Sequence, residues 1–503
     1  MSESCHASIY MNPCSIEEIR RIIDKLKNKT SESFDEISPK LLKLLKESLV
    51  FPLYIIINKC LNEGVFPEKL KLAKVYPLAK CSQTEYATNY RPISILSAFF
   101  KVFEKVINCR LVSFFDRNRI LYDKQYGFRP KHSTIDAVYD LITGIENNLE
   151  KRMKSLVTFV DLSKAFDSID HSILFSKLDL YGIRGTPLRL LQSYLTGRKQ
   201  AVAWNKIISG VQNINSGVPQ GSILGPLLFL IYVNDLHLNI DAEIIQYADD
   251  TTIILNENTV EDLNQKGVRC LTQLQNWLVQ NKLLLNLGKS KCMLFGASRR
   301  EMQRINIGLH NTYIDCVNDY KLLGIVLDVK LSWRPHIDTV KNKINKSLYA
   351  MRRLKSYFPK HLLRAVYFAL VQTHIDYGLK LWGNASRNTV KDIVIQQKKA
   401  IRIINQASYN AHTACLFNSS KILPLQNNLI LQELKVVHAF YHNNINKSII
   451  DKLRTPSRGY AVRSTDKIRS NRLLYGQNIW QTLSSAEHEL MWGKLSKVVK
   501  LKF

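Results

Sequence analysis

Long apolar runs are missing from this 503-residue sequence. The longest, residues 222–233, contains Gly225 and Pro226 and is shorter than the about 20 apolar residues that span a lipid bilayer. The first residues, MSESCH, also lack the basic start and the apolar core of a signal peptide. We therefore expect no membrane association and an intracellular location, in the nucleus, the cytoplasm or both.

Cysteine pairs of the kind that bind zinc are missing too. The nine cysteines include no Cys-x-x-Cys motif, and no spacing among them fits a zinc finger or a zinc knuckle. Scattered cysteines in an intracellular protein are expected to be free thiols. The sequence therefore predicts no structural zinc site.

Acidic residues are scarce relative to basic ones, with 42 Asp and Glu against 71 Lys and Arg. The resulting net charge of +29 predicts a polyanionic partner, either nucleic acid or an anionic membrane. A hydrophobic content of 46% is ordinary for a globular protein and excludes a disordered chain. The length allows two to four domains.

Two acidic sites interrupt strongly apolar sequence. Asp249 and Asp250 lie inside the run from Ile244 to Leu255, which predicts two short strands joined by a tight turn. Asp161 ends a second apolar strand, residues 156–160. An isolated Asp-Asp pair is usually a solvated turn, but adjacent carboxylates flanked by strands repel each other unless a cation binds. Three carboxylates can hold two Mg²⁺ ions for phosphoryl transfer, with Mn²⁺ as an alternative ion, so we expect a nucleic-acid polymerase.

Further motifs follow in a fixed order around these carboxylates. Phe166 comes five residues after Asp161, and Ser216–Ser222 includes Gly217 and Gly221, which permit close approach to a ligand. This set resembles the reverse transcriptases of non-LTR (LINE-type) retrotransposons, of the jockey and CR1 kind. The resemblance covers roughly residues 15–440 and includes additional blocks at residues 89–94, 125–129, 285–290, 320–324 and 376–402.

The resemblance implies a role for each matching residue. Asp161, Asp249 and Asp250 would hold the metal ions, and Lys289 would protonate the departing pyrophosphate. Phe166 would exclude the 2′-hydroxyl of a ribonucleotide, while Arg91 and Lys80 would bind the triphosphate. The complete nucleotide-binding set would be Lys80, Arg91, Leu162 (through its backbone), Phe166, Gln220 and Gly221.

The implied fold is α+β, a right-hand polymerase with fingers, a palm with an antiparallel sheet, and a helical thumb. We expect an N-terminal helical extension at 1–70, fingers and palm at 71–330, and the helical thumb and C-terminal region at 331–503. Relatives carry an upstream endonuclease domain, and we expect this chain to lack it because about 75 residues precede the fingers.

One stretch carries charge of a single sign. Residues 339–375 contain eight Lys or Arg and no Asp or Glu. Solvated faces usually mix both signs, so this stretch predicts a helix that follows a phosphate backbone, although a solvated charged face is the alternative. The candidate nucleic-acid contacts are Lys343, Lys346, Arg352 and Arg353.

Together these observations predict an RNA-directed DNA polymerase that binds an RNA template, a DNA primer and dNTPs, with no protein partner identified. Two alternatives stay open. An RNA-dependent RNA polymerase would share the carboxylates, but Phe166 argues against it. A catalytically inactive, nucleic-acid-binding relic of a retrotransposon would tolerate loss of the carboxylates, and all three are present.

Overall fold

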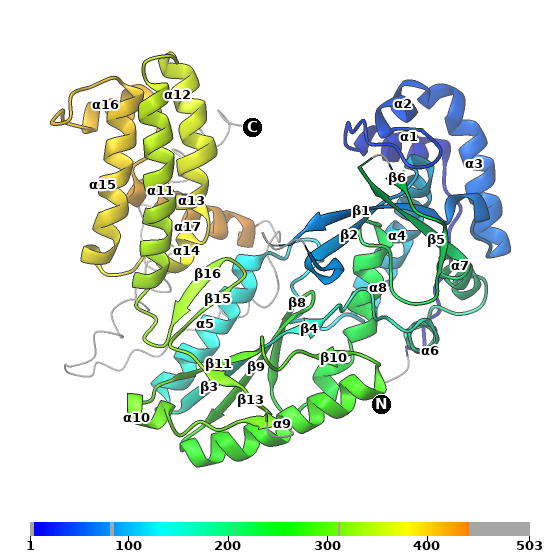
Figure 1. Cartoon of the computed structure of the whole chain (residues 1–503), viewed down its shortest axis with the longest axis horizontal. Coiled ribbons are helices and arrows are strands. Elements are labelled where there is room, and N and C mark those ends of the chain that lie inside the picture. Colours follow the sequence, from blue (N-terminus) through cyan, green and yellow to red (C-terminus); the bar gives the residue numbers. More distant parts are fainter. Residues whose placement is uncertain (1–4, 81–84, 206, 310–311, 442–503) are drawn as a thin grey trace.

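A computed structural model describes residues 5–80, 85–205, 207–309 and 312–441 of the chain. Its ribbon has two arms that rise from a central sheet (Figure 1). The N-terminal helices and a first sheet form one arm, and the C-terminal helices form the other. The central sheet lies at the base between them, so residues on its upper edge face the space between the arms.

The central sheet has five strands in the order β14-β11-β3-β9-β8. Neighbouring strands are antiparallel, except that β14 runs parallel to β11. Side chains alternate between the two faces along β3, so that Leu156 and Val160 join one apolar cluster while Val157 and Phe159 join another. The strands are β3 (Lys154–Val160), β8 (Glu243–Tyr247), β9 (Asp250–Glu257), β11 (Lys291–Phe295) and β14 (Asp315–Cys316).

Helices cover both faces of this sheet. On one face, α9 (Val260–Gln280) packs against β9. The buried side chains of α9 belong to the same apolar cluster as those of α6 (His171–Leu180) and α8 (Leu224–Val233). On the other face, α5 (Thr134–Glu150) packs against β3 and β8. Helix α8 is buried along almost its whole length, so the longest apolar run of the sequence is a core helix.

The N-terminal arm consists of helices packed on a smaller sheet. Ser15 caps α1 by accepting a hydrogen bond from the Glu18 N–H, as expected for a serine ahead of acidic residues. Helix α1 contacts α3 and α4, and α3 contacts α7. These helices are α1 (Ile16–Lys25), α2 (Pro39–Leu44), α3 (Lys46–Glu63), α4 (Ala98–Asn118) and α7 (Thr186–Leu195), with 3₁₀ turns at Glu68–Leu70 and Ala87–Asn89.

The sheet of this arm has the order β2-β1-β5-β6, with β7 also paired to β5. Strand β1 is antiparallel to β2 and parallel to β5. The strands are β1 (Leu72–Ala79), β2 (Tyr90–Ile95), β5 (Arg198–Trp204), β6 (Ile207–Ile208) and β7 (Gln212–Ile214).

Short strands surround the central sheet. Strand β4 (Leu162–Ser163) pairs with β10 (Leu284–Leu285), β12 (Gly308–Leu309) with β13 (Thr312–Tyr313), and β15 (Asp319–Leu322) with β16 (Ile325–Asp328). A 3₁₀ turn at Leu236–Leu238 and α10 (Arg299–Met302) complete this region.

The second arm is helical throughout the part that the structure describes. Helix α11 packs along α15, and their buried side chains belong to the same apolar cluster as α5 and one face of the central sheet. The arm is therefore anchored on the sheet by a continuous core. Its helices are α11 (Arg334–Leu354), α12 (Lys360–Tyr367), a π-helical turn (Phe368–Gln372), α13 (Thr373–Asp376), α14 (Leu379–Trp382), α15 (Arg387–Ile404), α16 (Ala414–Ser420) and α17 (Leu425–Tyr441).

The predicted mixture of helices with a mainly antiparallel sheet is confirmed. The boundaries at 70 and 330 stay predictions, and residues 442–503 of the predicted C-terminal region lie outside the described residues. Among the described helices, none is both long enough and apolar enough to cross a membrane.

Candidate active site

The β8–β9 hairpin carries two of the predicted carboxylates at its tip. Tyr247 pairs with Asp250, so Ala248 and Asp249 form a two-residue turn. Ala248 has a φ of 58°, a left-handed conformation that few non-glycine residues adopt. Because Val160 of β3 pairs with Thr251 of β9, the end of β3 lies beside the start of β9. The register therefore brings Asp161 next to the hairpin tip.

Asp161 is held by a loop that follows β10. Its backbone N–H donates to the Ser290 hydroxyl oxygen at 3.2 Å, and its carbonyl accepts a hydrogen bond from the Asn286 N–H at 2.9 Å. Leu162 pairs with Leu285, which fixes the backbone just after Asp161. Lys289 is exposed on this same loop. The backbone segment that carries Lys289 therefore lies beside the backbone at Asp161.

The three carboxylates influence one another electrostatically. Asp249 and Asp250 are accessible to solvent, yet the surrounding protein desolvates both enough to raise the pKa of each. Desolvation, followed by the negative charges of Asp249 and Asp161, raises the pKa of Asp250 to about 6. For Asp249, desolvation and Asp161 raise the pKa, whereas the cationic Arg91 opposes them. Mutual repulsion among three carboxylates indicates a site that favours cations.

The three carboxylates are chemically suited to a hard divalent cation, but they are not arranged to bind one as they stand. Within the described ranges, no group of three or more His, Cys, Asp and Glu side chains is arranged to hold a metal ion as it stands. The carboxylates of Asp161, Asp249 and Asp250 are nevertheless oxygen ligands of the type that Mg²⁺ prefers, and a cation would relieve their repulsion. Coordination would therefore require the carboxylates to move and further oxygens to join them.

Phe166 contacts two other aromatic rings, five residues after Asp161. Its ring stacks on Phe229 of α8 with the ring centres 4.5 Å apart, and its other neighbour is the edge of Phe128 at 6.1 Å. Two aromatic contacts fix the orientation of this half-buried ring.

The segment that contains Gln220 and Gly221 contacts both Asp167, next to Phe166, and strand β2 of the N-terminal arm. The Gln220 side-chain amide donates to the Asp167 carboxylate at 2.8 Å, and the Gln220 backbone carbonyl accepts a hydrogen bond from the Ser94 N–H at 2.9 Å. Gly221 has a φ of 113°, and a Cβ there would lie 2.9 Å from the Ser94 carbonyl oxygen. The glycine is therefore required by the close approach of β2.

The two predicted phosphate ligands lie on the sheet of the N-terminal arm. Arg91 is exposed on β2, opposite Leu78 of β1, and its charge reaches Asp249. Lys80 is exposed just after β1, where its N–H donates to the Asn89 carbonyl at 2.7 Å. Both cations thus belong to the β1–β2 pair or its edge, and Arg91 is the one whose charge acts on Asp249.

The predicted nucleic-acid contacts lie in the other arm. Lys343, Lys346, Arg352 and Arg353 are all exposed on α11. Within the described part of the chain, none of these four side chains makes an ion pair or a hydrogen bond to another side chain. Two other cations of the basic stretch bind intramolecularly instead, Lys341 to Asp392 of α15 at 2.7 Å and Arg364 to the Ser420 carbonyl at 2.7 Å.

Sequence reasoning missed how the β15–β16 hairpin approaches the site. The Tyr320 ring stacks on Phe159 with ring centres 4.0 Å apart, two residues before Asp161. Desolvation and then the charges of Asp250 and Asp161 raise the pKa of Tyr320. Tyr320 begins the block at residues 320–324 that resembles the family, but its stacking on Phe159 depends on the packing of β15 over the sheet, which no local pattern encodes.

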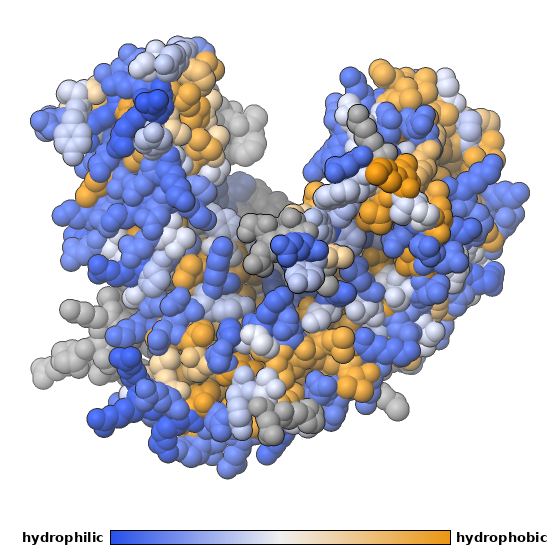
Figure 2. All heavy atoms as spheres, viewed as in Figure 1, coloured by the Kyte–Doolittle hydropathy of each residue, from blue (hydrophilic) through white to orange (hydrophobic). Residues whose placement is uncertain are grey.

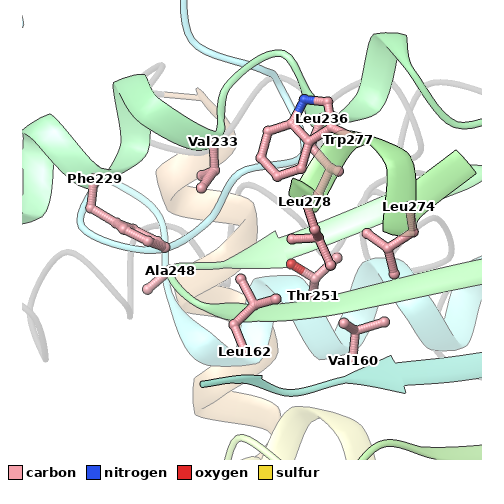
Figure 3. A pocket seen from close by; sticks show the side chains of 10 residues that line it. All are labelled: Val160, Leu162, Phe229, Val233, Leu236, Ala248, Thr251, Leu274, Trp277 and Leu278. Atoms are coloured by element: carbon pink, nitrogen blue, oxygen red, sulfur yellow. The ribbon is translucent and has the colours of Figure 1, made fainter. Parts of the chain in front are cut away.

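A small apolar cavity lies beneath the hairpin (Figure 3). Val160 and Leu162 line it from one side, Ala248 and Thr251 from the hairpin, and the remaining side chains come from α8, α9 and the intervening turn. Because the Leu162 side chain points into this cavity, only its backbone is available to the catalytic site. The full lining is Val160, Leu162, Phe229, Val233, Leu236, Ala248, Thr251, Leu274, Trp277 and Leu278.

Comparison with known proteins identifies a family that matches the region containing these residues. Residues 79–327 match the family described as reverse transcriptase (RNA-dependent DNA polymerase). The chain is 30% identical over 420 residues to a probable RNA-directed DNA polymerase from transposon BS of Drosophila melanogaster, covering 80% of this chain and 46% of the relative. It is 26% identical to the RNA-directed DNA polymerase from mobile element jockey of Drosophila funebris, covering 80% and 45%.

A third relative, the probable RNA-directed DNA polymerase from transposon X-element of Drosophila melanogaster, is 25% identical and covers 89% of this chain and 50% of the relative. The chain thus spans about half the length of these curated relatives. It contains a reverse transcriptase domain and is related to the RNA-directed DNA polymerases of non-LTR, LINE-type retrotransposons.

Proposed function

We propose that this chain is an RNA-directed DNA polymerase that adds dNTPs to the 3′-hydroxyl of a DNA primer on an RNA template. The observation that carries the proposal is the meeting of Asp161, Asp249 and Asp250 at the ends of adjacent strands, with Arg91 close enough to oppose the charge of Asp249. Such a site favours a reaction in which negative charge on phosphate must be stabilised.

The proposal assigns the arms to the parts of a right-hand polymerase. The central sheet with α5, α8 and α9 would be the palm, the N-terminal sheet and helices the fingers, and the C-terminal helices the thumb. Figure 2 shows a deep hollow between the arms, with hydrophilic residues over much of the C-terminal arm. A strongly basic chain with such a hollow suits a bound template and primer.

The proposed mechanism is in-line displacement at the α-phosphorus of the dNTP. When bound, two Mg²⁺ ions held by Asp161, Asp249, Asp250 and the Leu162 backbone would neutralise charge on the attacking and leaving oxygens, and Mn²⁺ would be an alternative. The primer 3′-hydroxyl would lose its proton to solvent as its oxygen forms the new bond to the α-phosphorus, and the bond from the α-phosphorus to pyrophosphate would break.

Three cations of the chain would assist this displacement. Arg91 and Lys80 would bind the triphosphate and hold it in line with the primer. The Lys289 ammonium would donate a proton to the departing pyrophosphate. The supporting observation for Lys289 is that its loop contacts the Asp161 backbone through Asn286 and Ser290.

Phe166 would select the sugar. Its stacking on Phe229 and its contact with Phe128 leave the ring little freedom to move away from an incoming 2′-hydroxyl. An RNA-dependent RNA polymerase would instead need space and a polar partner there. Gln220 and Gly221 would complete the pocket.

The test is primer extension on a defined RNA template with Mg²⁺, supplied with dNTPs in one reaction and rNTPs in another. We expect extension with dNTPs and poor extension with rNTPs. Equal extension with both nucleotides would favour the RNA polymerase alternative, and no extension with either would refute the proposal.

A further inference from the structure

Two buried glutamines lie side by side under the carboxylate turn. Gln125 and Gln246 form an isolated parallel bridge and are 2% and 1% exposed. Backbone hydrogen bonds join their segments, from the Tyr126 N–H to the Gln246 carbonyl at 2.8 Å and from the Gln246 N–H to the Lys124 carbonyl at 3.0 Å. The two residues thus share type, burial and location, but their side chains do different things.

The Gln125 side chain binds the backbone of the turn. Its Oε1 accepts hydrogen bonds from the Gly127 N–H at 2.9 Å and from the Ala248 N–H at 3.0 Å. Two donors converge on one atom, so this atom must be the amide oxygen. Within the described residues, the Gln125 Nε2 and both amide atoms of Gln246 have no hydrogen-bond partner. The Gln125 side chain therefore contacts the turn only through its acceptor oxygen, within the described residues.

Gly127 permits this close approach. A Cβ at Gly127 would lie 2.2 Å from the Ala248 nitrogen and 2.9 Å from the Tyr247 carbonyl carbon. Gly127 approaches Ala248, whose left-handed φ of 58° is unfavourable for a residue that has a side chain. A buried acceptor at the Ala248 N–H offsets the cost of that conformation, since an unpaired buried N–H is itself unfavourable. The same segment continues to Phe128, which contacts Phe166.

We propose that Gln125 is a positioning residue, which holds the Ala248 turn so that Asp249 and Asp250 stay directed toward Asp161. The expected effect on catalysis rests on the proposed polymerase function, whereas the hydrogen bond from the Ala248 N–H to Gln125 does not depend on it. Carboxylates that repel one another favour an open turn, and the buried hydrogen bond from Ala248 opposes that opening. Gln125 therefore contributes to the geometry of the reaction and has no contact with substrate.

The test uses Gln125→Met with Gln246→Met as its matched control, since methionine keeps the size of each side chain and removes its amide. We expect Gln125→Met to lower kcat about tenfold or more, because small displacements of catalytic groups are costly, with the KM for dNTP changed less than about twofold. Gln246→Met should leave kcat within about twofold of wild type, because its amide bonds nothing that the structure describes.

Hydrogen–deuterium exchange followed by mass spectrometry supplies a readout that needs no activity. Peptides covering residues 244–251 should exchange faster in Gln125→Met and at the wild-type rate in Gln246→Met. Gln125→Glu, which keeps an acceptor oxygen in either ionisation state, should retain slow exchange and covers the case in which Gln125→Met does not fold.

Equal losses of kcat in the two methionine variants, or unchanged exchange in Gln125→Met, would overturn the inference. Fast exchange in Gln125→Glu would do so as well. If the wild-type protein does not extend primers at all, the proposed function fails, and the exchange experiment still decides whether Gln125 holds the turn.

Discussion

The basic face of α11 offers a prediction whose size follows from helix geometry. At about 100° per residue, Lys343, Lys346 and Arg353 fall within about 80° of one another. Lys346 and Arg353 lie opposite the buried residues of α11, and Lys343 lies at the edge of the buried face. Arg352 falls about 100° away from Arg353, on the other flank. Three of the four predicted contacts can therefore meet one phosphate backbone, and we expect Lys343→Gln, Lys346→Gln and Arg353→Gln together to remove three contacts.

Each neutralised duplex phosphate contributes about −0.9 to the slope of log affinity against log salt concentration, so the triple variant should have a slope about 2.7 units flatter than wild type. Between 50 and 200 mM salt, the wild-type protein should then lose about 40-fold more affinity for primer–template than the variant does. Fluorescence anisotropy with a labelled primer–template, titrated at four salt concentrations, measures both quantities.

The matched control is Lys341→Gln, on the same helix. Lys341 already pairs with Asp392, so its replacement should leave the salt slope within about 0.3 units of wild type, a small fraction of one phosphate contact. An identical slope in wild type and the triple variant would show that these three cations do not contact phosphate and would identify this face of α11 as a solvated surface. A flattened slope in Lys341→Gln would also contradict it, since a paired lysine should not contact phosphate.

Two further predictions concern the catalytic site. Phe166→Val should raise the efficiency of rNTP incorporation relative to dNTP in single-nucleotide extension, because it removes a ring fixed by Phe229 and Phe128; an unchanged ratio would reject the role in sugar selection. Asp250→Asn should raise the Tm of the metal-free protein at pH 7, because ionising Asp250 above its pKa of about 6 costs folding stability. The folded pKa is raised above the unfolded value, so this cost decreases as pH falls from 6 and is gone near pH 4; thermal melts in EDTA with equal Tm values at every pH would contradict the assignment.

The strands that carry the three carboxylates were predictable because their signals are local. An apolar run interrupted by Asp249 and Asp250 indicated a hairpin, and the pairing of Tyr247 with Asp250 confirms that hairpin. The strand that ends at Asp161 was equally clear from residues 156–160, which form most of β3. A short apolar run rich in β-branched and aromatic residues indicates a buried strand without reference to the rest of the chain.

The supports of the site were not predictable, because they connect residues far apart in the chain. Gln125 contacts Ala248 across 123 positions, whereas the side-chain amide of the equally buried Gln246 has no hydrogen-bond partner within the described residues. The bond from Ser290 to the Asp161 backbone spans 129 positions. Only tertiary packing decides which of several polar residues meets a given backbone group.

The basic stretch shows the same limit on charge patterns. The sequence grouped eight cations together, but Lys341 and Arg364 bind Asp392 and the Ser420 carbonyl and so stabilise the helical arm itself. The acidic partner of Lys341 lies 51 positions away, outside the window in which charges were counted. Helix geometry then separates Arg352 from the other candidates, which composition alone does not do.

Asp161 and Asp249 are proposed to support polymerisation by a reverse transcriptase. The most direct measurement compares primer extension on an RNA template by wild type, Asp161→Asn and Asp249→Asn, together with the Kd of each for the same primer–template. We predict dNTP-dependent extension by wild type and its loss in both variants, with each Kd within about threefold of wild type, because the carboxylates face the reacting phosphate and make no contact with the distant backbone. Extension at near wild-type rates by either variant would contradict the claim.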